Sequence, residues 1–254
     1  MSSSTSSGAR STAAKPVAPP GSQPVLRAQH LSKSYHSPVL RDLDVGIEPG
    51  QFVAIMGPSG SGKSTLLHCL SGMDRPSAGS VLLGDTEITT MSEKELAALR
   101  LTRFGFVFQQ AHLMTTLCLL DNIVLPGFLA GLRPRPEITA RGEELMESMG
   151  IADLAASGVT EVSGGQLQRA GICRALINDP GIVFADEPTG ALNSTTALQI
   201  LDLLGQVHAS GTTLVMVTHD AQVAARADRV LVLVDGRIEE DLALGRYREA
   251  EAPS

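Results

Sequence analysis

The sequence contains no tryptophan, and aromatic residues make up only 3% of its 254 positions. Proteins that hold single-stranded nucleic acid stack its bases on aromatic side chains, so this composition disfavours such a platform. The formal net charge is −7 and the sequence pI is near 5.4. An acidic chain does not offer the broad positive surface that neutralises DNA or RNA phosphates. We therefore expect no nucleic-acid partner.

Cysteine is also scarce. Cys69, Cys118 and Cys173 are isolated, their number is odd, and no Cys-x-x-Cys pair occurs. This spacing supports neither a disulfide framework nor a zinc site. We expect all three to be small buried apolar residues in a reducing compartment.

Long apolar runs are lacking as well. The nearest candidate for a membrane span is residues 113–132, but Asp121, Asn122 and Pro126 interrupt its middle. Residues 1–24 are rich in Ser, Ala, Pro and Gly, which predicts a disordered tail rather than an export signal. Residues 241–254 form a second tail with no recognisable pattern. We expect a cytoplasmic chain that depends on another protein for any membrane role.

The remaining residues, 25–240, alternate between strand and helix patterns. Residues 25–50 contain short alternating apolar and polar runs, which predict an antiparallel layer. The apolar runs FVAIM, GIVFADEP, TTLVMVT and RVLVLVDG are separated by helical patterns, as in a mostly parallel α/β sheet. SVLLGDTEI reads as one more strand, and SEKELAALRLTR as a helix with a Ser92–Glu95 capping box. From about residue 111 to residue 180 the sequence has several helical patterns and no buried strand pattern, which predicts an inserted helical subdomain.

A glycine-rich segment follows the FVAIM strand and precedes a helix pattern. It reads GPSGSGKS and satisfies the phosphate-loop pattern G-x-x-x-x-G-K-[ST] in full. Small residues let successive N–H groups point at phosphates, and the helix N-terminus favours negative charge. Lys63 then supplies a charge for the β- and γ-phosphates, and the Ser64 hydroxyl can bind Mg²⁺. The predicted nucleotide-binding residues of this loop are Gly57, Pro58, Ser59, Gly60, Ser61, Gly62, Lys63, Ser64 and Thr65.

Polar residues end three further strand patterns. Asp186 and Glu187 follow the apolar run IVFA, Gln109 ends FGFVFQ, and His219 ends TTLVMVTH. Ligands in open α/β sheets bind at the carboxyl ends of the strands. We predict that Asp186 joins Ser64 in the Mg²⁺ shell, that Glu187 activates the attacking water, that Gln109 contacts metal and water, and that His219 binds the γ-phosphate. Together with Lys63, these residues form the candidate catalytic set.

A second glycine cluster, VSGGQLQRA at residues 162–170, precedes a helix pattern. Glycine costs about 1 kcal/mol relative to alanine inside a helix, so a glycine pair normally marks a turn. This cluster offers a second set of backbone N–H groups at a helix N-terminus. The phosphate loop alone does not explain why the chain needs it.

The motifs GPSGSGKST, FVFQQ, SGGQLQR, IVFADEP, TGALN and VTHD occur here in an order that resembles the ATP-binding subunit of ABC transporters. The resemblance is strongest to exporter-type ATPases paired with FtsX-like permeases in lipoprotein-release, macrolide-export and antimicrobial-peptide systems. It covers residues 25 to about 240. It implies a P-loop NTPase fold of the ABC ATPase type, with ATP and Mg²⁺ as cofactors and with two partners, an FtsX-like membrane permease and a second copy of the chain.

The resemblance also implies roles for individual residues. Tyr35 would stack on adenine, Glu187 would be the general base and His219 the switch histidine. Gln109 would begin the loop that links the nucleotide site to the membrane subunit. The signature segment would contact the γ-phosphate of ATP bound to the opposite subunit; it comprises Ser163, Gly164, Gly165 and Gln166.

Two positions depart from the family pattern. Asn193 replaces the aspartate of an Ala-Leu-Asp segment, and Val162 replaces a leucine at the start of the signature. Asparagine keeps a hydrogen-bond acceptor but loses the charge, which puts the communication between the paired ATP sites in doubt. A simpler interpretation of Asn193 is a helix N-cap, because asparagine caps helices as well as aspartate does.

The resemblance predicts an ATPase that drives a separately encoded permease and is held peripherally on the inner face of the cell membrane. Two alternatives remain open at this point. One is the ATPase of a regulatory, non-transporting FtsX-like complex, and the other is a soluble ABC ATPase without a permease. A GTPase is disfavoured because no N-K-x-D segment is present. The cargo is not identified by these residues.

Overall fold

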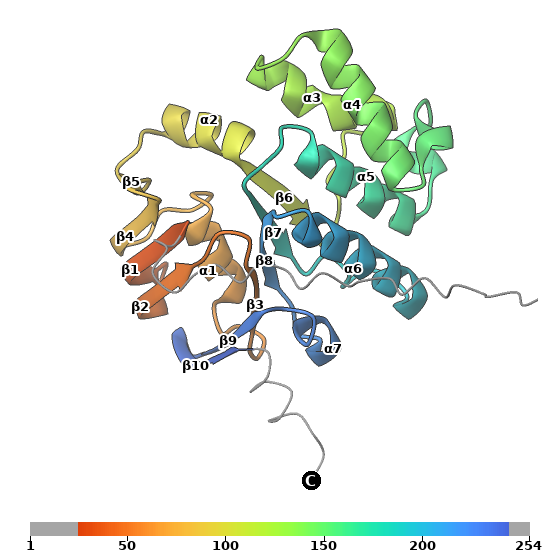
Figure 1. The fold of residues 1–254 in the computed structure, drawn as a ribbon. Coiled ribbons are helices and arrows are strands. Elements are labelled where there is room, and N and C mark those ends of the chain that lie inside the picture. Colours follow the sequence, from red (N-terminus) through yellow and green to blue (C-terminus); the bar gives the residue numbers. More distant parts are fainter. Residues whose placement is uncertain (1–24, 244–254) are drawn as a thin grey trace, which may run out of the picture.

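The computed structural model describes residues 25–243 (Figure 1). The tail expected at residues 1–24 and the last residues of the C-terminal tail, 244–254, lie outside the described residues. Within the described range the last strand, β10 (Arg237–Ala243), continues past residue 240, where we had placed the end of the domain.

A six-stranded sheet forms the centre of the fold, in the order β10-β9-β3-β8-β7-β6. All its strands from β9 to β6 pair in parallel, and only β10 pairs antiparallel with β9. This arrangement confirms the mostly parallel sheet predicted from the sequence. Its remaining strands are β3 (Phe52–Met56), β6 (Phe104–Phe108), β7 (Ile182–Asp186), β8 (Thr213–Val217) and β9 (Arg229–Val234).

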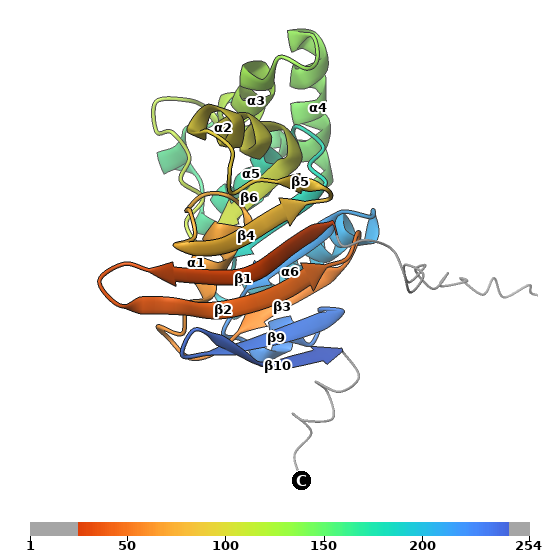
Figure 2. The same ribbon diagram turned by 90° about the vertical axis from the view of Figure 1, so that its left-hand side faces the viewer.

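A separate four-stranded antiparallel sheet lies beside the first, in the order β2-β1-β4-β5 (Figure 2). Its strands are β1 (Leu26–Ser34), β2 (Pro38–Ile47), β4 (Ala78–Leu83) and β5 (Thr86–Glu87). The antiparallel layer is therefore confirmed, but the single strand expected for SVLLGDTEI is wrong. The segment is a hairpin, because Gly84 adopts a φ of +57° and turns the chain between β4 and β5.

Side chains of the parallel strands alternate between two hydrophobic cores. In β3, Val53 and Ile55 pack toward the antiparallel sheet, whereas Phe52 and Ala54 pack on the opposite face. Helix α1 (Lys63–Leu70) fills the space between the two sheets and contacts β1, β2, β7 and β8. Both faces of the central sheet are thus covered, which explains why its strands read as continuous apolar runs.

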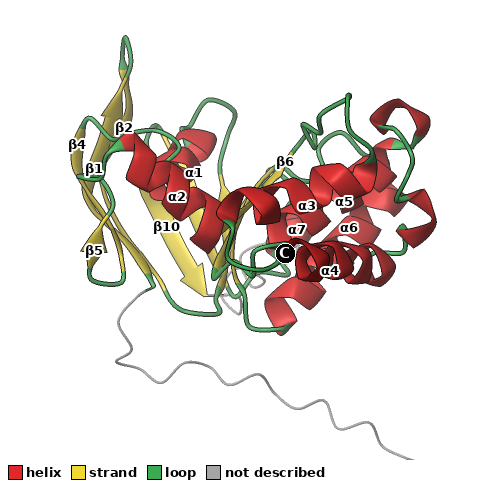
Figure 3. Cartoon of the chain, turned by 90° about the horizontal axis from the view of Figure 1, so that it is seen from above, coloured by secondary structure: helices red, strands yellow, loops and turns green. Residues whose placement is uncertain are grey.

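Helices cover the other face and one end of the sheet (Figures 1 and 3). Segment 111–180 contains α3, α4 and α5 and no named strand, and α5 packs against β6. The Ser92–Glu95 capping box is present at the start of α2, as predicted. The helices are α2 (Glu93–Arg103), α3 (Leu119–Ala130), α4 (Arg135–Ser148), α5 (Gly164–Leu176), α6 (Ser194–Ala209) and α7 (Ala221–Ala224), with short 3₁₀ turns at Ala152–Leu154 and Val159–Glu161.

Among residues 25–243, none of the helices has the length and apolar character that a bilayer crossing requires. Residues 113–132, the run considered above, form a loop and the helix α3 with Pro126 inside it. Cys69 and Cys173 are buried as expected, and burial raises the pKa of each thiol to about 12. Cys118 corrects the expectation, because it is only half-buried and its sulfur accepts a hydrogen bond from the Asp121 N–H at the start of α3.

Candidate functional site

The candidate residues meet at one edge of the parallel sheet. Strand β3 leads into the glycine loop, β7 ends at Asp186, and Gln109 and His219 follow β6 and β8 within two residues. Parallel strands place their carboxyl ends along the same edge. The topology therefore brings together groups that are up to 162 residues apart in sequence, counted from Gly57 to His219.

The glycine loop between β3 and α1 uses backbone conformations that require glycine. Gly57 has a φ of +138°, and a Cβ there would lie 1.9 Å from the carbonyl oxygen of Leu233. Gly60 and Gly62 have φ values of +79° and +102°. A side chain at Gly57 would collide with backbone that cannot move away, so the loop can approach β9 only because this position is bare.

Lys63 is buried and folds back over the loop. Its Nζ donates to the carbonyl oxygens of Gly57 at 2.9 Å and of Pro58 at 2.8 Å. The ammonium therefore sits at the N-terminus of α1, where backbone N–H groups already favour an anion. A cleft of about 490 Å³ opens over this loop, and its lining includes Ser59, Gly60, Lys63, Glu187 and His219.

Ser64 and Asp186 face each other across the sheet edge. The Ser64 hydroxyl donates to Asp186 Oδ1 at 3.0 Å. Burial raises the pKa of the Asp186 carboxyl, although the Ser64 hydrogen bond and the nearby His68 act in the opposite direction. A hydroxyl and a carboxylate at this separation can bind one hard cation together, since Mg²⁺ prefers oxygen ligands. Ser64, Gln109 and Asp186, the three predicted metal residues, line one cleft of about 550 Å³.

His68 belongs to this cleft, and sequence reasoning missed it. Its Nε2 lies 3.8 Å from Asp186 Oδ2, on the side of the carboxylate that Ser64 leaves free. The residue is hidden in the apolar helix pattern TLLHCL. Its spacing was a usable signal, because positions four apart on a helix share a face and His68 is four residues after Ser64.

Glu187 occupies a strained position directly after β7. Its φ is +45°, which is uncommon for a residue with a side chain, and its N–H donates to the Val217 carbonyl at 3.0 Å. The turn directs its carboxylate to His219, whose Nδ1 lies 3.5 Å from Glu187 Oε1. Gly190 lies beside both Glu187 and Gln109: a Cβ on it would be 3.3 Å from Glu187 Oε2 and 2.9 Å from Gln109 Nε2. Backbone strain of this kind clusters at functional sites.

Tyr35 stands on the loop between β1 and β2, and 58% of it is exposed. Its pKa is raised, first by the hydrogen bond to Asp74 and then by burial, while the neighbouring Thr65 hydroxyl lowers it. Because Thr65 lies in the first turn of α1, the phenol is next to the phosphate loop. The structure therefore places an exposed aromatic ring at the rim of this site.

The second glycine cluster begins a helix rather than forming a turn before it. Gly164 and Gly165 are the first two residues of α5, and Ser163 and Gln166 form a capping box in front of them. The backbone N–H groups of this cluster thus lie at a helix N-terminus, as expected from the sequence. Close packing accounts for the second glycine, because a Cβ on Gly165 would lie 2.4 Å from Thr196 Cγ2 of α6. None of the residues from Ser163 to Gln166 lines the phosphate-loop cleft of its own chain, within the part that the structure describes.

Asn193 caps helix α6, which confirms the simpler interpretation of this position. Its Oδ1 accepts from the Thr196 N–H at 2.9 Å. We expect Asn193→Ala to lower the free energy of unfolding by about 1 kcal/mol, which corresponds to a fall in Tm of about 2–4 °C for a domain of this size. Asn193→Asp should leave Tm unchanged, because aspartate caps equally well. Thermal unfolding of the three proteins checks this, and an equal loss in both variants would contradict the capping role.

The sheet topology and the glycine loop place this chain among P-loop NTPases, and the added antiparallel sheet and helical segment are those of an ABC ATPase cassette. The family described as "ABC transporter" matches residues 40–190. The chain belongs to this family.

A solved structure and two curated sequences are similar to this chain over most of its length. The dimeric structure of the ATP-binding cassette MJ0796 bound to ADP and Pi is 36% identical, with a TM-score of 0.80 over 86% of this chain and 98% of that one. The macrolide export ATP-binding/permease protein MacB of Rhodopseudomonas palustris (strain BisB18) is 45% identical over 89% of this chain. MacB of Neisseria gonorrhoeae (strain ATCC 700825 / FA 1090) is 42% identical over 83% of this chain. This chain spans about one third of the length of these two relatives, 34% in each.

Proposed function

We propose that the chain binds ATP with Mg²⁺ at the phosphate loop, hydrolyses it between two copies, and thereby drives a membrane permease that exports its substrate. The observation that carries this proposal is a pair of clefts that share Ser64 and Glu187: one contains Lys63 and the glycine loop, and the other contains Asp186, which accepts a hydrogen bond from Ser64. Such a set supplies a phosphate cradle, oxygen ligands and a base in one place.

Each residue of the cleft has a distinct task in this proposal. The loop N–H groups and Lys63 hold the phosphates, and Ser64 and Asp186 hold the cation with Gln109 beside them. Mg²⁺, when bound, neutralises charge on the phosphates. Glu187 accepts a proton from the water that attacks the γ-phosphorus, and the bond from that phosphorus to the bridging oxygen of ADP breaks. His219 is 3.5 Å from Glu187, so it can orient this carboxylate and reach the γ-phosphate.

The second copy supplies Ser163, Gly164, Gly165 and Gln166. In one chain this segment lies outside the phosphate-loop cleft, yet it presents backbone N–H groups at a capped helix N-terminus. MJ0796 is dimeric in structures that include an ADP- and Pi-bound state. We infer that this chain also forms a dimer, in which two copies bind two ATP molecules between them with Tyr35 stacked on the adenine.

The permease partner is inferred from relatives and from an exposed apolar surface. Both MacB relatives are described as ATP-binding/permease proteins, and this chain matches about one third of each. Three large apolar side chains, Met114, Leu129 and Leu132, are 51–67% exposed on segment 110–135. Two other residues of this segment, His112 and Pro126, line a cleft of about 430 Å³ together with residues of β6, α2 and α5. Exposed apolar patches of this kind mark protein–protein contacts.

This surface would hold the chain on the cytoplasmic face of the membrane. That the permease is FtsX-like and encoded separately stays a prediction. Substrate choice would lie with the permease, so export of a peptide, lipoprotein or drug-like compound is proposed as a class only.

We expect Leu129→Asp and Leu132→Asp to release the chain from native membranes, because a charge on an apolar interface leaves an unpaired carboxylate when the interface closes. The amount of protein in washed membranes should fall at least about tenfold, the effect of roughly 1.4 kcal/mol of lost binding. The ATPase activity of the purified chain should stay the same. Leu198→Asp is the matched control, since Leu198 is 46% exposed on α6, outside segment 110–135. Retention of the two variants at the level of the control would contradict this surface.

A further inference from the structure

Tyr35 is tied to the loop that follows α1. Its hydroxyl donates to Asp74 Oδ2 at 2.5 Å. The other oxygen of the same carboxylate accepts from Lys33 Nζ, also at 2.5 Å. Asp74 therefore holds two residues near the end of β1, Lys33 and Tyr35.

Lys33 covers one side of the tyrosine ring. Only 8% of this residue is exposed, and its Nζ lies 4.7 Å from the centroid of the Tyr35 ring. An ammonium at this distance over a ring is attracted to its π-electrons. Because Lys33 is buried and lies over the ring while 58% of Tyr35 is exposed, we infer that the ring face opposite Lys33 is open to solvent.

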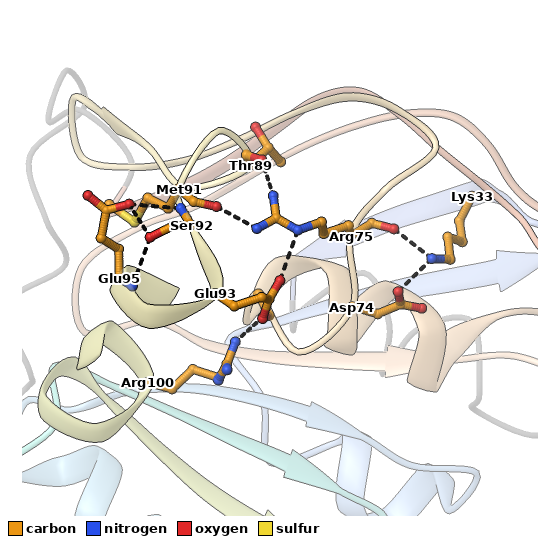
Figure 4. Close-up of polar contacts among 10 residues, drawn as sticks. Lys33, Asp74, Arg75, Thr89, Met91, Ser92, Glu93, Glu95 and Arg100 are labelled. Atoms are coloured by element: carbon orange, nitrogen blue, oxygen red, sulfur yellow. Dashed lines mark hydrogen bonds and ion pairs between the residues drawn. The ribbon is translucent and has the colours of Figure 1, made fainter. Parts of the chain in front are cut away.

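The anchoring loop is itself fixed on its far side. Lys33 Nζ also donates to the Arg75 carbonyl at 2.6 Å (Figure 4). The Arg75 guanidinium in turn donates to the carbonyl oxygens of Thr89 and Met91 and to the Glu93 carboxylate, which hold it against the N-terminus of α2. The loop that carries Asp74 is thus held by hydrogen bonds to β1, to the Thr89–Met91 loop and to the start of α2.

The hydrogen bonds to the Asp74 carboxylate also favour its charged form. Burial acts to raise the pKa of Asp74, but the hydrogen bonds from Lys33 and Tyr35 outweigh it, and the net pKa is lowered. Asp74 is therefore ionised at neutral pH and accepts from both partners at once. A charge-assisted bond of this kind is stronger than one between neutral groups.

We propose that Asp74 and Lys33 are positioning residues of the adenine site, which hold the Tyr35 ring in place so that its open face receives the base. This inference rests on the proposed ATP binding and on the proposed role of Tyr35. The ring would otherwise stand on an exposed loop and would have to be ordered each time a nucleotide binds, which weakens binding. Because the Tyr35 hydroxyl already donates to Asp74, the ring would contact the base by stacking on its face and not by hydrogen bonds to its edge.

The test compares ADP with inorganic pyrophosphate, which shares its phosphates but has no base. The dissociation constant of pyrophosphate divided by that of ADP reports the contribution of the adenosine. Both constants are measured by competition against labelled ADP. Tyr35→Ala should lower this ratio by about 5- to 100-fold, the usual worth of base stacking on an aromatic side chain. Tyr35→Phe, Asp74→Asn and Lys33→Met should each lower it about two- to tenfold, because the ring remains but loses its anchors.

Pyrophosphate affinity is the readout that a merely structural role would move. We expect it to stay unchanged in all four variants. The double variant Tyr35→Phe/Asp74→Asn should fall no further than Asp74→Asn alone, since Asp74→Asn already weakens the hydrogen bond that Tyr35→Phe removes. Glu93→Gln is the matched control: it breaks only the exposed ion pair with Arg75 and should leave the ratio at the parent value.

The outcomes separate this inference from the proposed function. If Tyr35→Ala lowers the ratio but Tyr35→Phe and Asp74→Asn do not, the positioning role is overturned and the adenine role stands. A loss of pyrophosphate affinity equal to the loss of ADP affinity also overturns it. If Tyr35→Ala leaves the ratio unchanged, the adenine role of Tyr35 fails together with the positioning role.

Discussion

Replacing Glu187 with glutamine is expected to lower ATP turnover about 10²–10⁴-fold, the usual contribution of a positioned general base. The amide has nearly the shape of the carboxylate but cannot take a proton from water. In the proposed site the phosphates contact the glycine loop and Lys63 rather than Glu187, so nucleotide binding should persist. The variant should therefore accumulate as an ATP-bound dimer.

Two measurements check this result. Steady-state phosphate release gives the turnover, and size-exclusion chromatography with and without ATP gives the dimer. Glu137→Gln serves as the control, because Glu137 is an exposed residue in the first turn of α4 and lies outside the cleft. Turnover at the parent rate in Glu187→Gln would show that another group is the base. If Glu187→Gln loses turnover but stays monomeric with ATP, only the expected accumulation of the dimer is contradicted.

The sequence was informative wherever chemistry is encoded by neighbouring residues. The glycine loop, the strand-end carboxylates and the apolar strands are local patterns, and the fold class follows from their alternation. In the structure, Ser64, Gln109 and Asp186 line one cleft although they lie far apart in sequence. Parallel topology does this automatically, because it gathers the carboxyl ends of strands at one edge.

The features that escaped sequence reasoning depend on contacts between distant segments. Position 165, in the first turn of α5, is glycine because Thr196 of α6 approaches its backbone, and no local pattern shows that approach. The Asp74 anchor of Tyr35 joins residues 39 positions apart. SVLLGDTEI was misread because alternation alone does not reveal the left-handed Gly84 that divides it. Residues whose identity is set by contact with a distant segment were thus the hardest to predict.

Replacing Gly164 with aspartate is expected to abolish ATP-dependent dimerisation and turnover while leaving monomeric ATP binding nearly intact. The monomer should fold normally. A Cβ on Gly164 would meet only Leu192 Cδ2, at an ordinary 3.7 Å, and an acidic residue is favourable in the first turn of a helix. In the proposed dimer, the same carboxylate would stand next to the γ-phosphate bound by the other copy, and like charges repel.

Gly164→Asn is the matched control, because it adds the same volume without the charge. We expect it to dimerise more weakly than the parent but better than Gly164→Asp, and the difference between the two isolates the electrostatic effect. The measurement is best made in the Glu187→Gln background, in which ATP-bound dimers are expected to accumulate. ATP binding to the monomer is titrated in parallel. If Gly164→Asp weakens that binding as strongly as it weakens dimerisation, the segment serves its own chain's nucleotide, and the assignment of Ser163–Gln166 to the opposite copy is wrong.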